Sequence, residues 1–109
     1  MGIDHAWEQF YTEIRLALVS DASPQDRLSK LRSGLCHLQR ESFPSDHVWD
    51  EFRKLVNETT KRDTRLGQGE RSRAATSQMT NEEAKEHLQA AFDIFVHVTK
   101  AFGRAEFII

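Results

Sequence analysis

The chain has a single cysteine, Cys36, among its 109 residues. One thiol excludes an internal disulfide and a cysteine-rich zinc site within one chain, so we expect a protein of the reducing cytoplasm. No apolar run approaches the about 20 residues that span a bilayer. The N-terminal stretch MGIDHAWEQF lacks the apolar core of a signal peptide. These absences favour a cytoplasmic protein with no membrane partner.

The sequence also has little net charge, −2 at neutral pH. A balance this small gives no overall attraction for nucleic acid or for an anionic membrane, so any such affinity has to be local. Hydrophobic residues make up 39% and charged residues 29% of the chain, which is typical of a globular protein. At this length we expect one domain over residues 1–109.

Apolar side chains recur at helical spacing in four segments. In the first, the residues Ile3, Trp7, Phe10, Ile14 and Ala17 lie alternately four and three positions apart, which places them on one face of a helix. Leucines in the second segment and mixed aromatic and aliphatic residues in the third repeat this spacing. The pattern predicts amphipathic helices that pack on one another.

Capping residues mark where these helices begin. Ser23 precedes Pro24, as expected where serine caps a helix and proline takes its first position. Ser45 follows Pro44, which disfavours helix in the residue before it, so Ser45 can cap the helix that begins next. Gly34 lies inside the second predicted helix, where it costs about 1 kcal/mol relative to alanine. A neighbouring helix packed closely against Gly34 would explain the glycine.

The last predicted helix has the clearest signals. Thr80 and Glu83 have the spacing of a capping box, and Gly103 predicts the C-terminal stop. Between them runs an uninterrupted stripe of Ala84, Leu88, Ala91, Phe95, Val98 and Phe102.

These signals together predict an all-α fold. We expect a four-helix bundle with helices at about 3–19, 24–41, 46–60 and 80–102, a long basic connection at 61–79, and an apolar C-terminal tail at 104–109. Connections as long as 61–79 are uncommon in small domains and are usually functional or disordered.

The last helix is also apolar outside its stripe. Phe92 and Val96 fall on one flank and Ile94 on the other. Two explanations remain open: the helix is the central element of the bundle, or its extra flank meets a second copy or another protein.

The connection carries a local excess of positive charge. Five basic residues face two acidic ones between residues 61 and 73, a net charge of +3, which leaves −5 for the rest of the chain. The segment either rests solvated against its own acidic helices or recognises an acidic surface or a phosphate backbone. Nucleic-acid binding is disfavoured by the lack of aromatic residues and by the acidic remainder. The basic residues are Lys61, Arg62, Arg65, Arg71 and Arg73.

The run GQGERSRAATSQMTNEEA, with AWEQFY near the N-terminus, resembles a group of short uncharacterised bacterial all-helical proteins. Members have a glycine-rich stretch, small residues, methionine and then Ser/Thr-x-Glu-Glu-Ala before an amphipathic helix. The resemblance implies a bacterial source and no known activity. Arg71 and Arg73 make this segment more basic than the group's pattern.

Catalytic and metal-binding patterns are incomplete. Glu83 with His87, and Asp93 with His97, are four residues apart on the last predicted helix, but a stable metal site needs three or four ligands. Cys36 adjoins His37, yet adjacent helical residues point in different directions. We therefore predict no catalytic residues, no metal and no cofactor.

The leading hypothesis is a small non-enzymatic protein that binds another protein, which includes the case of a second copy of itself. The alternative is a nucleic-acid-associated accessory factor that uses residues 61–73, and a metal-dependent enzyme ranks third. The predicted partner-binding residues are Arg62, Arg65, Arg71, Arg73, Phe92, Val96, Phe107 and Ile108.

Overall fold

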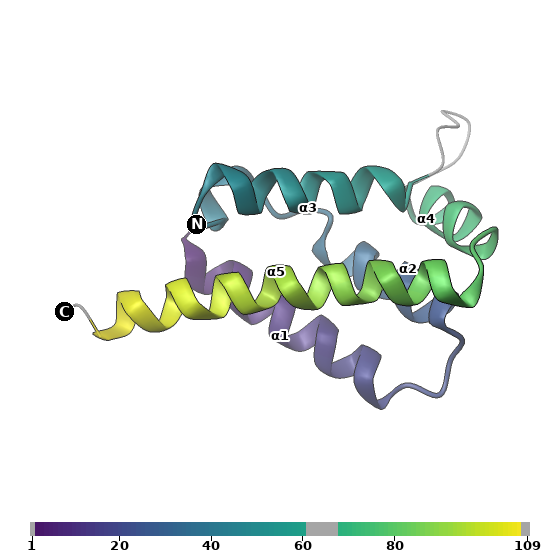
Figure 1. Ribbon diagram of the computed structural model, residues 1–109, viewed down its shortest axis with the longest axis horizontal. Coiled ribbons are helices and arrows are strands. Elements are labelled where there is room, and N and C mark those ends of the chain that lie inside the picture. The colour runs from purple at the N-terminus through teal and green to yellow at the C-terminus, as the bar shows by residue number, and fades with distance from the viewer. Residues whose placement is uncertain (1, 61–67, 108–109) are drawn as a thin grey trace.

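All regular secondary structure in the described residues is helical (Figure 1). The computed structural model describes the backbone of residues 2–60 and 68–107 and the side chains of 2–60 and 73–103. The elements are α1 (Ile3–Val19), α2 (Pro24–Leu35), the 3₁₀ turn η1 (Arg40–Ser42), α3 (Asp46–Glu58), α4 (Gln68–Ser77) and α5 (Asn81–Phe107). The predicted all-α fold class is confirmed.

The predicted helix starts are confirmed by their capping hydrogen bonds. The hydroxyl oxygens of Ser23 and Ser45 each accept a bond from the backbone N–H three residues ahead, at 3.2 and 3.3 Å. Thr80 and Glu83 form a reciprocal capping box, in which each backbone N–H donates to the other's side chain at 3.2 and 3.1 Å. These local bonds fix where α2, α3 and α5 begin.

Helix α2 ends earlier than predicted, at Leu35 instead of residue 41. Cys36 is its C-cap, and the chain then turns so that Phe43 enters the interior, where only 4% of it is exposed. Arg40 holds this turn, since its guanidinium bonds both the Phe43 carbonyl and the Asp46 carboxylate. Burial of Phe43 thus outweighs continuation of the helix.

The predicted connection at 61–79 contains a helix that the sequence pattern did not predict. Helix α4 (Gln68–Ser77) packs mainly against α2. The segment has strong helix formers but no apolar stripe, so its tertiary contacts decide its conformation. Near the C-terminal end of α4, Thr76 is buried, with 2% of its surface exposed.

Helix α5 is longer than predicted and extends from Asn81 to Phe107. Gly103 lies within it, and no described glycine has a positive φ angle, so the predicted stop at Gly103 is wrong. A glycine inside a helix costs about 1 kcal/mol, which its helix-forming neighbours offset. Residues 104–107 of the predicted tail are therefore the last turn of α5, and 108–109 lie outside the described residues.

Helix α5 runs through the middle of the molecule, antiparallel to both α1 and α3 (Figure 1). Trp7 of α1 stacks on Phe102 with ring centres 5.0 Å apart, and Phe10 lies 6.5 Å from Phe95. Residue numbers therefore rise along α1 as they fall along α5. Contacts with α1, α2 and α3 bury α5 on more than one side, and this intrachain packing explains much of its broad apolar surface.

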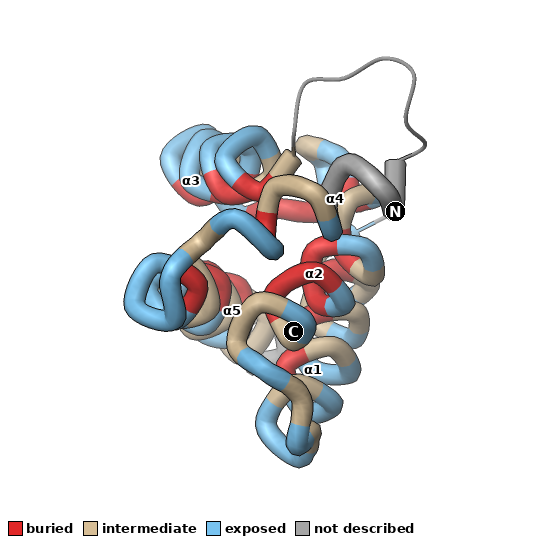
Figure 2. The backbone as a smooth tube through the Cα atoms, turned by 90° about the vertical axis from the view of Figure 1, so that its right-hand side faces the viewer, coloured by how far each residue is buried: buried red, intermediate tan, exposed pale blue. Residues whose placement is uncertain are grey.

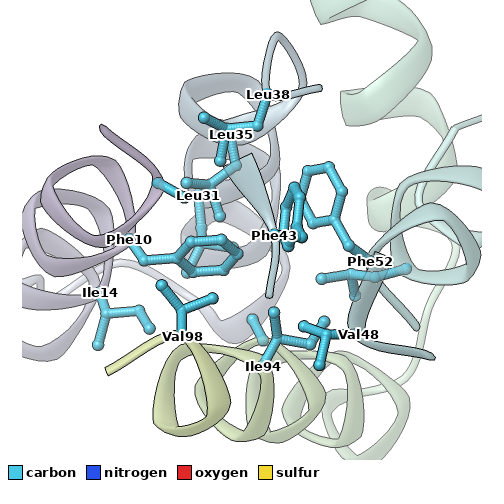
Figure 3. Packing of buried hydrophobic residues seen from close by; sticks show 13 residues of the cluster. Phe10, Ile14, Leu31, Leu35, Leu38, Phe43, Val48, Phe52, Ile94 and Val98 are labelled. Carbon is cyan, nitrogen blue, oxygen red and sulfur yellow. The ribbon is translucent and has the colours of Figure 1, made fainter. Parts of the chain in front are cut away.

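The core lies where α1, α2, α3 and α5 converge (Figures 2 and 3). Phe10 meets Phe43 and Phe52 at ring distances of 6.2 and 5.9 Å. Ile94 and Val98 project from α5 toward them, as Figure 3 shows. Ile94, which the sequence places on a flank of the apolar stripe, is a core residue with 4% of its surface exposed, as expected if the helix is buried on more than one side. The compact unit has a radius of gyration of 14.0 Å.

Gly34 has the close helix neighbour that its position predicted. The carboxyl group of Glu13 on α1 occupies the space beside Gly34, where an added Cβ would collide with it. The glycine thus makes room for the end of the Glu13 side chain against α2. Within the described ranges, no helix is both long and apolar enough to cross a membrane.

Candidate binding groove between α1, α2 and α5

A groove with a volume of about 370 Å³ lies between the C-terminal half of α1, the first turns of α2 and the first half of α5. Its size falls in the usual range for binding sites between helices. The antiparallel packing of α1 on α5 brings these segments together. Its apolar lining consists of Ile14, Ala17, Leu18, Leu31, Leu88 and Phe92.

Large apolar side chains stand around this groove in contact with solvent. Leu18 is 75% exposed and Phe92 is 44% exposed, and both line the groove. Leu16 and Val19, which are close to Leu18 in the sequence but do not line the groove, are 57% and 73% exposed. Residues 16–19 form a continuous apolar run, and successive helical residues point about 100° apart, so one core cannot bury them all. An exposed cluster of this kind is a feature of interaction surfaces.

The polar residues of the groove include two cations, Arg27 and Lys85. The Arg27 Nε atom is buried and has no hydrogen-bond partner in the described part of the chain. The Lys85 side chain is 62% exposed, and its Nζ atom lies 3.8 Å from a carboxylate oxygen of Glu82. Because that pair is exposed and long, it contributes little and leaves Lys85 available to a partner.

A second cavity of about 310 Å³ lies on the other side of Arg27. It shares Ala17, Arg27 and Leu31 with the groove and adds Leu16, Lys30 and Glu13. Burial raises the pKa of the Glu13 carboxyl, although its electrostatic interaction with His37 acts in the opposite direction. The apolar end of α1 is therefore bordered by hollows on two sides, with Arg27 between them.

The structure separates the residues that the sequence assigned to one binding surface. Phe92 lines the groove, whereas Val96, one turn further along α5, is partly buried and outside the groove lining. Arg73 is exposed on α4 and does not line the groove either.

Other predicted binding residues fall at or beyond the limits of the description. Arg71 is part of α4 and Phe107 ends α5, but their side chains are not described. Arg62, Arg65 and Ile108 lie outside the described residues.

The predicted histidine pairs are placed on the side of α5 that faces α3. The two ring nitrogens of His87 contact the Glu83 backbone oxygen at 2.8 Å and the Glu58 carboxylate at 3.0 Å, so His87 joins α5 to the end of α3. Asp93 and His97 border a cavity of about 250 Å³ together with His47 and Glu51 of α3. Among the residues with described side chains, no three or more histidine, cysteine, aspartate or glutamate groups are placed to hold a metal ion.

The sequence interpretation missed Leu18, Arg27 and Lys85, which line the groove, and the exposed Leu16 and Val19 on the same end of α1. The run of four apolar residues from Leu16 to Val19 was the available signal, because it exceeds what one helical face can bury. Arg27 and Lys85 gave no such signal, since each becomes notable only when α2 and α5 are brought together.

No family model matches the chain, and no curated protein or solved structure is similar enough to it to count as a match.

Proposed function

We propose that this chain is a non-enzymatic protein-binding module and that the groove between α1, α2 and α5 is its binding surface. The observation that carries the proposal is the combination of an apolar groove with two large, exposed apolar side chains in its lining, Leu18 and Phe92. Exposed apolar area of this kind loses its contact with water when a partner covers it. Large aromatic and aliphatic side chains at the centre of such a surface supply most binding energy.

The scaffold of the proposal is a four-helix bundle of α1, α2, α3 and α5, with α4 packed on α2. In this arrangement a rigid core supports the groove from below, so binding requires little rearrangement of the backbone. A cytoplasmic location and a bacterial source remain part of the proposal, as inferred from the lone cysteine and from the sequence resemblance.

Binding through the basic residues 61–73, which is the nucleic-acid alternative, is a separate hypothesis. Of the arginines there, only Arg73 has a described side chain, and it is exposed on α4. The apolar groove favours a protein partner over a phosphate backbone, because nucleic-acid contacts are dominated by charge.

Site-specific photo-crosslinking in the source cells tests the proposal. A photoreactive phenylalanine analogue is placed at Leu18, and a matched control carries it at Lys54, an exposed residue of α3 away from the groove. We expect a discrete protein adduct from position 18 that is absent from position 54. The adduct should disappear in a Phe92→Asp background, because a carboxylate in the groove opposes apolar contact.

Circular dichroism of the Phe92→Asp variant provides the folding control. Phe92 is 44% exposed, so the helical signal and the unfolding midpoint should change little. Adducts of equal yield at positions 18 and 54, or none at either, would contradict a binding role for the groove.

A further inference from the structure

We infer that the partner of the groove is an acidic amphipathic helix of another protein. Its apolar side chains would enter the groove beside Leu18 and Phe92, and its aspartate or glutamate residues would pair with Arg27 and Lys85. This inference rests on the proposed function, because it specifies the chemistry of the segment that the same groove takes. A groove between helices that accepts the apolar face of another helix is a recurrent mode of recognition.

Arg27 gives the groove its preference for negative charge. Its Nε atom is buried and has no hydrogen-bond partner in the part of the chain that the structure describes. A buried polar group without a partner is costly, and a guanidinium matches a carboxylate with two parallel hydrogen bonds. A carboxylate that reaches Arg27 from the groove would therefore satisfy a group that the described part of the chain leaves unsatisfied.

Lys85 extends the positive charge along the α5 side of the groove, and Lys30 does so in the adjoining cavity. Among the acidic groups nearby, Glu82 lies 3.8 Å from Lys85, Asp93 accepts a hydrogen bond of 3.0 Å from the groove-lining Gln89, and Glu13 lies in the adjoining cavity. The titratable side chains that line the groove itself are both basic. An acidic helix would pair with both, whereas a basic helix would be repelled by both.

The distribution of apolar surface distinguishes a helix from a small amphiphile. Leu18 and Phe92 line the groove and are 75% and 44% exposed, so much of their apolar surface faces outward from it. A small molecule inside the groove would leave that surface in water, whereas a helix of diameter about 10 Å lying along the opening would also cover it. Leu18 and Phe92 therefore favour a macromolecular partner.

A second copy of this chain is the less favourable occupant. A two-fold interface built on this groove places the same patch on both subunits, so Arg27 and Lys85 of one subunit would face a lining whose titratable residues are again the same two cations. Like charges brought together at an interface are costly when they lose water. Another protein with acidic residues avoids this repulsion.

Designed helical peptides test the inference directly. Two fluorescein-labelled peptides of about 18 residues, roughly 27 Å as helices, carry the same leucines at i, i+3, i+4 and i+7. Glutamate flanks the leucines in one peptide and lysine in the other, and a third peptide keeps the glutamates but replaces the leucines by alanine. Binding is measured by fluorescence anisotropy at low and moderate salt.

We expect saturable binding of the glutamate–leucine peptide, at least roughly tenfold weaker binding of the lysine peptide, and none of the alanine peptide. Arg27→Gln should weaken binding of the glutamate–leucine peptide roughly tenfold and reduce the difference in affinity between the glutamate–leucine and the lysine–leucine peptides. Lys54→Gln, which removes an exposed lysine of α3 outside the groove, should leave both affinities unchanged. Higher salt should weaken binding of the glutamate–leucine peptide to the unaltered protein more than its binding to the Arg27→Gln variant.

The outcomes separate this inference from the proposed function. If both leucine peptides bind equally and Phe92→Asp abolishes that binding, the inference of an acidic partner is wrong. The groove would then still be the binding surface. Absence of binding by either leucine peptide would count against the groove itself. Concentration-dependent dimerisation in sedimentation experiments that Phe92→Asp abolishes would assign the groove to a second copy and overturn the inference.

Discussion

Arg32 of α2 lies in the interior, with 2% of its surface exposed. Its Nη2 atom donates a hydrogen bond to the Thr60 hydroxyl, but its Nε and Nη1 atoms have no partner within the described ranges. Burial lowers the pKa of Arg32 from its ordinary value, because desolvation disfavours the charged form. A guanidinium with so few hydrogen bonds reduces stability.

We predict that Arg32→Met stabilises the protein by about 1–3 kcal/mol, because methionine fills similar space without a buried charge. Thr60→Val should destabilise it by a similar amount, about 1–3 kcal/mol, since it removes the one side-chain hydrogen bond that Arg32 makes to a described residue. Urea unfolding of both variants checks the prediction. In the double variant the Thr60→Val penalty should shrink, because no guanidinium remains to be satisfied. Destabilisation by Arg32→Met itself would contradict this account.

At the scale of the element, Gly103 distinguishes a helix end from a helix interior. A C-terminal stop places glycine at positive φ, where alanine is strained, whereas Gly103 lies inside α5 with nothing within 4 Å of an added Cβ. We therefore predict that Gly103→Ala stabilises the protein by about 0.5–1 kcal/mol.

Thermal unfolding followed by circular dichroism measures the effect of Gly103→Ala. Thr80→Ala is the comparison for a real helix terminus, because it removes the hydroxyl of the capping box and should cost about 1 kcal/mol. A lower melting temperature for Gly103→Ala would mean that α5 ends at Gly103.

The helices also show which boundaries local sequence signals can predict. The starts of α2, α3 and α5 could be predicted because serine, proline and the Thr80–Glu83 pair act within one turn. Helix α4 could not, since its conformation depends on packing against α2 and not on an apolar period of its own. The end of α2 depends on burial of Phe43 against Phe10 and Phe52, a contact between distant segments.

The same limit applies to the candidate site. Phe92 could be singled out from the sequence because α5 has more apolar positions than one stripe needs. Arg27 and Lys85 could not, because they are 58 positions apart in the chain and meet only at the groove. Sequence periodicity indicates which face of a helix is apolar, but not which helices will leave part of that face uncovered.

For the whole molecule, the two tryptophans lie in different parts of one continuous core. Trp7 stacks between Tyr11 and Phe102, with ring centres 5.3 and 5.0 Å away. Trp49 of α3 packs against Phe43, and Arg53 lies 5.6 Å above its ring. Both contact the single buried cluster that α1, α2, α3 and α5 share.

We predict that the whole unit unfolds in one cooperative transition. The variants Trp7→Phe and Trp49→Phe each leave one fluorescent reporter, and in each variant the urea midpoint from fluorescence should match that from far-ultraviolet circular dichroism. Because the two midpoints are measured on the same variant, a difference in stability between the two variants does not affect the comparison. A fluorescence midpoint clearly below the dichroism midpoint in the variant that retains Trp7 would show that α1 separates from α5 first.

The half-exposed Cys36 at the end of α2 has a practical consequence. As the one thiol in the sequence, it can take a single maleimide dye without any engineered residue. Nine positions along the same helix axis separate it from Arg27, about 14 Å. A dye on this sulfur would therefore sit close enough to register an incoming labelled peptide by resonance energy transfer, yet outside the surface that the peptide would occupy.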